Sequence, residues 1–160
     1  MPDEPIASPF LAQTKAMVLA RIVSHMDGVG RGIVGSYPMA EVQSWPIQRG
    51  EAIILTEMGE ETVLLMTEAD ILETAPFLLD VCTAHYGQPA DDTERATRLW
   101  AKAVAVKANA DTWEALSAFV NGLRARCSDR IGAALDNDEV FTIESETQSE
   151  LTQFRDQYGV

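Results

Sequence analysis

Apolar side chains recur at steps of three and four residues along most of the chain, a spacing typical of amphipathic α-helices. The first such series comprises Leu11, Val18, Ile22, Met26 and Val29. A longer series comprises Leu99, Ala103, Val106, Ala110, Trp113, Leu116, Val120, Leu123, Cys127, Ile131 and Ala134. Asp92 and Glu94 precede it, and acids favour the positively polarised start of a helix. Because no proline follows Pro89, we expect one long helix over residues 91–136.

The predicted long helix determines the expected fold class. It would span roughly 60 Å, more than a compact domain of this mass requires, even if it is interrupted near residues 109–111 or at Gly122. Such a helix needs a partner in the same chain or in another. We therefore predict an all-α fold, arranged as an elongated helical hairpin or bundle with one long C-terminal helix.

Prolines and glycines predict where the first helix begins and ends. The prolines and acids among residues 1–9 predict a loose arm, and Ser8 and Pro9 suit the cap and first position of a helix. Glycines follow at positions 28, 30, 32 and 35, and each costs about 1 kcal/mol relative to Ala inside a helix. We therefore expect this helix to loosen near Asp27 and the chain to turn there.

Two further prolines, Pro38 and Pro46, lie within the most informative segment of the chain. Together with the anchoring aromatic Trp45 they predict a hinge over residues 37–52. A short helix is expected over residues 47–57, entered at Ser44, with Pro46 in its first turn.

Residues 58–90 carry local signals for further short helices. Gly59 predicts a loop, and Thr67 and Asp70 have the spacing of a capping box, in which each side chain bonds to the backbone of the other residue. Pro76 is expected to bend or restart the next helix, which should end at Gly87.

The segment after the long helix has the composition of a strand. Residues 140–143, Val-Phe-Thr-Ile, are β-branched or aromatic, so we expect a short isolated strand. An acidic tail follows, in which Leu151, Phe154 and Tyr158 allow a weakly docked helix. The expected organisation is one domain plus a tail, made of residues 1–36, 37–90, 91–136 and 137–160.

Charge and cysteine content narrow the class of partner. The 160 residues carry a formal net charge of -13, from 25 acidic and 12 basic side chains. Nucleic acids and anionic membranes attract clusters of Lys and Arg, so we expect neither as a partner. No apolar segment approaches the roughly 20 residues that cross a bilayer. The cysteines, Cys82 and Cys127, lack metal-binding or redox spacing and should be buried thiols.

Candidate chemistry is scarce. Residues 30–35 have the G-x-G-x-x-G pattern of dinucleotide-binding loops, but they lack the preceding strand and the following helix that the motif requires. His25 and His85 have no partner at useful spacing, and the acids between residues 57 and 73 do not follow the calcium-loop pattern. We therefore predict no catalytic residue, no cofactor, no metal site and no enzymatic activity.

Three blocks carry a resemblance to a known family. They are Tyr37-Pro38 with Glu41, Ser44-Trp45-Pro46, Gln48 and Glu51-Ala52, then residues 76–80, and then residues 122–134, Gly-Leu-Arg-Ala-Arg-Cys-Ser-Asp-Arg-Ile-Gly-Ala-Ala. In order and spacing they resemble the tail-fibre assembly proteins and small fibre-associated proteins of tailed bacteriophages. The resemblance covers about residues 10–135.

The resemblance implies a function without chemistry. It implies a factor that binds the tail-fibre protein and helps it to trimerise or attach, in the host cytoplasm during assembly. A permanent component of the virion tail or baseplate is the first alternative, and a small regulatory helical domain is the second. A homo-oligomer, with a trimer favoured in a fibre complex, is also compatible with this reading.

The candidate partner-binding residues come from three segments. The junction supplies Tyr37 and Trp45, although local packing that fixes the hinge is the favoured role for Trp45. The long helix supplies Trp113, Leu116, Val120, Leu123, Arg126 and Arg130. The two arginines either complement the negative end of the helix dipole or pair with acids of a partner. The predicted strand supplies Val140 and Phe141, which would add to a β-rich fibre edge.

Overall fold

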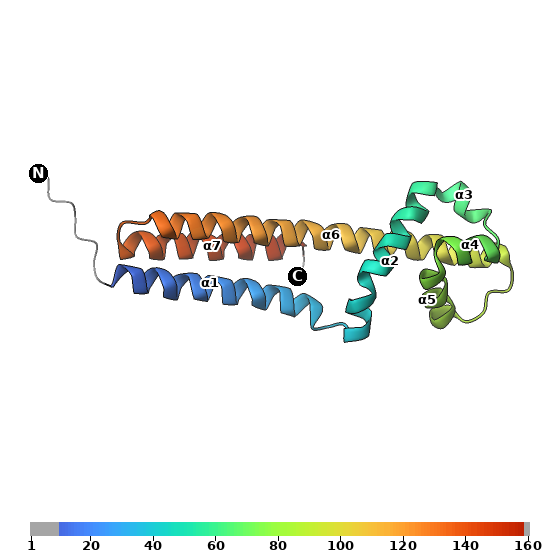
Figure 1. The fold of residues 1–160 in the computed structure, drawn as a ribbon, viewed down its shortest axis with the longest axis horizontal. Helices are drawn as coiled ribbons and strands as arrows, with labels where there is room; N and C mark the ends of the chain where they lie inside the picture. Colours follow the sequence, from blue (N-terminus) through green and yellow to red (C-terminus); the bar gives the residue numbers. More distant parts are fainter. Residues whose placement is uncertain (1–9, 159–160) are drawn as a thin grey trace, which may run out of the picture. The chain divides into compact units, whose positions relative to one another are not determined.

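The computed structural model describes residues 10–158, and these residues form helices only (Figure 1). The helices are α1 (Leu11–Val34), α2 (Met39–Met58), α3 (Glu60–Leu64), α4 (Glu68–Thr74), α5 (Pro76–Tyr86), α6 (Asp92–Ala133) and α7 (Asn137–Tyr158). The all-α prediction is confirmed. The loose arm expected for residues 1–9 and the cap expected at Ser8 and Pro9 lie outside the described residues.

The chain divides into two compact units. Unit 1 contains the described residues up to Tyr37 and those from Leu116 onward, and unit 2 is Pro38–Ala115. The long helix α6 therefore contributes its C-terminal part to unit 1 and its N-terminal part to unit 2. This grouping differs from the four segments expected from the sequence.

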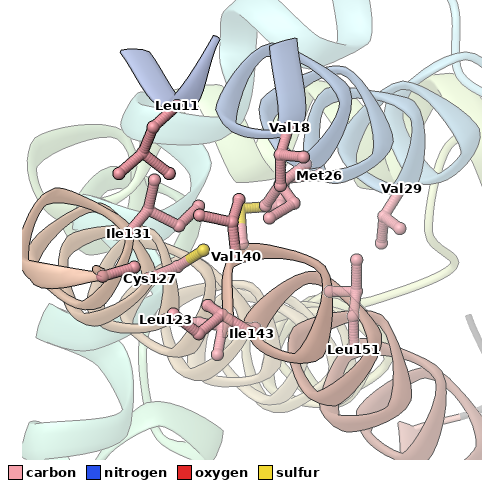
Figure 2. Close-up of a cluster of buried hydrophobic side chains, with 12 residues drawn as sticks. Leu11, Val18, Met26, Val29, Leu123, Cys127, Ile131, Val140, Ile143 and Leu151 are labelled. Carbon is pink, nitrogen blue, oxygen red and sulfur yellow. The ribbon is translucent and has the colours of Figure 1, made fainter. Parts of the chain in front are cut away.

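Unit 1 is built from α1, the end of α6 and α7, which surround one apolar core. Within this unit α7 runs in the same direction as α1 and opposite to α6 (Figure 1). Figure 2 shows side chains of all three helices converging. The buried members are Leu11, Val18, Ile22, Met26, Val29, Leu123, Cys127, Ile131, Ala134, Val140, Ile143 and Leu151. These positions match the two helical series of the sequence and continue them into α7.

The strand predicted at residues 140–143 is wrong, because this segment lies in α7. Val140 and Ile143 are buried in the core of unit 1, whereas Phe141 between them is 44% exposed. Burial continues at Thr147, Leu151 and Phe154, which is helical spacing. Packing on α1 and α6 therefore overrides the preference of β-branched residues for strands. The C-terminal segment is a helix of the core.

The prediction that α1 loosens near Asp27 is also wrong. The helix continues through Gly28, Gly30 and Gly32 to Val34. Val29 lies in this stretch and is buried in the core of unit 1. Its burial offsets part of the conformational cost of the neighbouring glycines, which is about 1 kcal/mol each.

Helix α2 begins earlier than the sequence predicts. It starts at Met39, after Pro38, and holds Pro46 in its interior, so it is not entered at Ser44. Proline lacks the N–H group that would continue the helical hydrogen bonds at this turn. The Ser44 hydroxyl donates to the Glu41 carbonyl at 2.7 Å, and Gln48 Nε2 donates to Ser44 Oγ at 2.7 Å. These side-chain bonds link the turns on both sides of the proline.

Several local signals are confirmed. Thr67 and Asp70 form a capping box at the start of α4, Pro76 occupies the first turn of α5, and Gly87 ends α5 with a positive φ of 77°. The single long helix is confirmed as α6, which is continuous through Gly122. Gly59, at φ 86°, interrupts the helix as expected, but the loop prediction is wrong for Glu60–Leu64, which form the short helix α3.

Unit 2 packs α2, α3, α4, α5 and the start of α6 around a second apolar core. Its buried members are Ala52, Leu55, Val63, Met66, Ile71, Ala75, Leu78, Leu79, Cys82, Leu99 and Ala103. Every one of these helices contributes at least one buried apolar side chain. The resemblance-bearing residues of α2 and α5 lie in this unit with the candidates Trp45 and Trp113, whereas the other candidate residues lie in unit 1.

Candidate interaction surface

The two tryptophans expected to contact a partner lie against each other in unit 2. The rings of Trp45 in α2 and Trp113 in α6 meet edge to face, with centroids 6.0 Å apart and an interplanar angle of 62°. Close by in sequence, Arg49 forms an ion pair with Glu114. Both contacts join α2 to α6, so the local packing role considered for Trp45 is present in the structure.

A second link joins α2 to α5. The Glu51 carboxylate accepts the backbone N–H of Phe77 at 3.1 Å through Oε1 and the backbone N–H of Leu78 at 2.7 Å through Oε2. The residue at the cap position of α5 is Ala75, whose side chain cannot accept a hydrogen bond. Glu51 therefore supplies the cap of α5 from another helix. Two of the three resemblance-bearing blocks meet at this contact.

The side of α2 away from the core exposes four large apolar side chains, and the exposed polar residues Gln43 and Glu57 lie in the same sector. Met39, Ile47, Ile54 and Met58 are 73%, 53%, 47% and 38% exposed, respectively. At 3.6 residues per turn these four positions fall within about 100° of one another around the helix axis. The buried positions Gln48, Ala52 and Leu55 occupy a different sector of the helix. We call the four exposed residues the apolar face of α2.

The apolar face of α2 was missed in the sequence, although a signal was present. The residues of this face recur at steps of four, seven and eight, which is a helical series of its own. In the sequence this series alternates with the buried series that includes Ala52 and Leu55. The helix therefore carries apolar residues in two sectors. Periodicity alone does not indicate which sector the rest of the chain covers.

Acidic side chains lie next to the end of this face. Glu57 precedes Met58, and Glu60 and Glu61 follow Gly59 in α3. All three glutamates are exposed, and none forms an ion pair with the residues that the structure describes. The surface therefore combines exposed apolar side chains with unneutralised negative charge.

The candidate residues of the long helix other than Trp113 lie in unit 1. Leu116 and Leu123 are buried, and Val120 packs against the core of unit 1, to which Leu123 belongs. Arg126 forms an ion pair with Glu150, and Arg130 pairs with Glu146 at 2.7 Å. The acids that these two arginines contact thus belong to α7 of the same chain.

The remaining candidates have different surroundings. Val140 is fully buried in unit 1, and its neighbour Phe141 is exposed. Tyr37 is 44% exposed and is the last residue of the first chain segment of unit 1, just before α2. The strand-addition mode predicted for residues 140–143 has no basis, because the segment is helical.

The remaining features of the described residues concern metal ligands, thiols and bilayer-spanning helices. No group of three or more His, Cys, Asp or Glu among residues 10–158 is arranged to hold a metal ion. Cys82 and Cys127 are free and buried, and burial raises the pKa of the Cys82 thiol. None of the helices in this range has both the length and the apolar character needed to cross a bilayer.

Comparisons of the chain with protein-family models, with curated proteins and with solved structures give no match.

Proposed function

We propose that this chain is a non-enzymatic assembly factor of a tailed bacteriophage, which binds the tail-fibre protein and supports its oligomerisation or attachment. The proposal starts from the resemblance of residues 37–52, 76–80 and 122–134 to that family. It also agrees with the two cores, which are formed by helices packed without a metal-binding cluster among the described residues.

The proposal depends most on α2, in which one sector of the helix makes internal contacts and another sector is exposed. The resemblance-bearing side chains of this helix have internal partners: Trp45 contacts Trp113, Gln48 bonds to Ser44, and Glu51 caps α5. The other sector of the helix exposes the four large apolar side chains of the apolar face. A helix with apolar residues in two sectors has one sector available to another molecule. Unit 2 therefore supports a protein-binding role.

Finer features belong to the same proposal. The whole chain forms an elongated hairpin or bundle, it acts in the host cytoplasm during assembly, and it forms a homo-oligomer that is a trimer in the fibre complex. Retention in the virion tail is the alternative fate.

Co-expression with the tail-fibre protein of the same phage tests the binding function. The tagged full chain is purified, and the mass of the eluted complex and the trimeric fraction of the fibre are measured with and without it. We expect co-elution at a defined stoichiometry and a larger trimeric fraction. A chain that elutes alone, together with an unchanged trimeric fraction, would refute the proposal.

Mass spectrometry of purified particles separates the two fates. An assembly factor is absent or far below the fibre in amount, whereas a permanent tail component is present at a fixed ratio to it.

A further inference from the structure

We propose that the apolar face of α2 binds a basic amphipathic helix of the partner protein. That the partner is a tail-fibre chain rests on the function proposed above. The chemistry of the bound segment is inferred from unit 2 alone.

The geometry of the face suits a helical segment. Ile47, Ile54 and Met58 follow one another at steps of seven and four residues on one side of a regular helix. Gly50 lies in the same sector, and a Cβ placed there would meet nothing within 4 Å. Glycine lowers the surface between the larger side chains. A second helix can therefore approach this sector and insert apolar side chains at complementary spacing.

Charge identifies the kind of helix. No Lys or Arg occurs between Arg49 and Arg95, a stretch that includes the end of the face and all of α3, α4 and α5. The two flanking arginines are paired: Arg49 with Glu114, and Arg95 with Asp92 and Glu68. The glutamates at 57, 60 and 61 are exposed and have no basic partner within the described range. Lys or Arg on the bound segment would supply the missing positive charge.

The same charge argues against other occupants. A second copy of this chain would bring its own acidic stretch against the first, and like charges facing each other oppose association. A nucleic acid would be repelled in the same way. The complementary ligand is a helix with apolar residues on one side and Lys or Arg beside them.

A synthetic probe peptide of about 20 residues tests this inference, with Leu at helical spacing and Lys on the flanking positions. The matched peptide replaces every Lys with Glu. Fluorescence anisotropy with the full chain measures the dissociation constant of each. We expect the Lys peptide to bind at least about tenfold more tightly than the Glu peptide, with an affinity that falls as salt is raised from about 50 to about 300 mM.

Two variants of the chain locate the binding surface. The double substitution I47S/I54S removes apolar surface without changing charge, and we expect it to weaken the Lys peptide by about tenfold or more. The matched control M17S/F141S removes two comparably exposed apolar residues from unit 1 and should change the dissociation constant less than about twofold.

The triple substitution E57Q/E60Q/E61Q tests the charge. It should reduce the salt dependence of the affinity for the Lys peptide. The control D27N/D129N/D156N removes three exposed acids of unit 1 and should leave that salt dependence unchanged. Circular dichroism and the thermal midpoint verify that every variant is folded. Equal affinity for the two peptides, or equal binding by I47S/I54S and the wild type, overturns the inference.

The fibre co-elution experiment keeps this inference distinct from the proposed function. If I47S/I54S still binds the fibre protein as the wild type does, the surface is wrong and the function stands. If the wild type binds the Lys peptide through this face and ignores the fibre protein, the function is wrong and the surface stands.

Discussion

Glu51 accepts a 2.7 Å hydrogen bond from the backbone N–H of Leu78 and so caps a helix that begins 25 residues after it in the chain. The cap position of α5, Ala75, has no side-chain acceptor, and Pro76 has no N–H. The first free amides of α5 therefore depend on a carboxylate from α2. One side chain both satisfies these amides and joins two helices of unit 2.

Replacing Glu51 should destabilise unit 2. We expect E51A to lower the free energy of unfolding by about 1–3 kcal/mol, since two partly buried backbone donors lose a charged acceptor. E51Q should lower it less, because one acceptor oxygen remains. Urea unfolding measures both. The control E57A removes an exposed glutamate of the same helix and should stay within about 0.5 kcal/mol of wild type. Equal effects at positions 51 and 57 would contradict the capping role.

The contact between Trp45 and Trp113 should appear as an energetic coupling. A double-mutant cycle with W45A, W113A and the double variant should give a coupling free energy of about 0.5–1.5 kcal/mol, as for edge-to-face aromatic pairs. The measurement is urea unfolding of the four proteins. Strictly additive effects would show that the two rings do not stabilise each other.

Substitutions at positions 141 and 143, two residues apart, test whether the segment 140–143 is helical. I143A should lower the free energy of unfolding by about 2–5 kcal/mol, because Ile143 is buried in the core of unit 1. F141A should cost about 1 kcal/mol or less, since its side chain points away from that core and is exposed. A strand would place residues 141 and 143 on the same side. Similar losses in the two variants would therefore favour the strand.

Alanine should stabilise the glycine-rich end of α1. G28A and G32A should each raise the free energy of unfolding by about 0.5–1 kcal/mol, because the added Cβ meets nothing within 4 Å and the helix loses less entropy on folding. G35A is the opposing control, since its Cβ would lie 2.7 Å from the Arg31 carbonyl oxygen. Thermal unfolding measures all three. No gain at positions 28 and 32 would argue against a continuous helix there.

The capping box of α4 should contribute a pH-dependent stabilisation. Hydrogen bonds from the Thr67 backbone N–H and hydroxyl hold the pKa of Asp70 below its ordinary value. The stabilisation is therefore fully present above the unfolded pKa of about 3.9 and is lost as the pH falls through the lower folded value. The thermal midpoint of D70N should lie below that of wild type near pH 7, and the gap should narrow below about pH 4. A constant gap would exclude this linkage.

The elements that the sequence predicted correctly depend on local signals. The start of α4 follows from Thr67 and Asp70, and the start of α5 from Pro76. The start of α6 follows from the acids before Thr93, where Asp91 accepts the Glu94 N–H at 2.8 Å. Partners in these motifs are at most four residues apart, so their geometry can be inferred before any tertiary contact is known.

The errors arose where packing outweighed local preference. Residues 140–143 have a strand-like composition, yet α7 buries Val140 and Ile143 against α1 and α6. The glycines after Asp27 weaken a helix, yet α1 continues beyond them. The signal that could have corrected the first error is the helical series from Val140 to Phe154, which extends beyond the four residues of the predicted strand.

The sequence by itself determined that the chain is helical, where α4, α5 and α6 begin, and that α6 is long, because periodicity and capping act between near neighbours. The tertiary structure decided which apolar series each core covers, that Glu51 serves α5, that Trp45 meets Trp113, and that one sector of α2 stays exposed. These outcomes depend on contacts between residues distant in the chain, and a helical series gives no information about which neighbour will cover it.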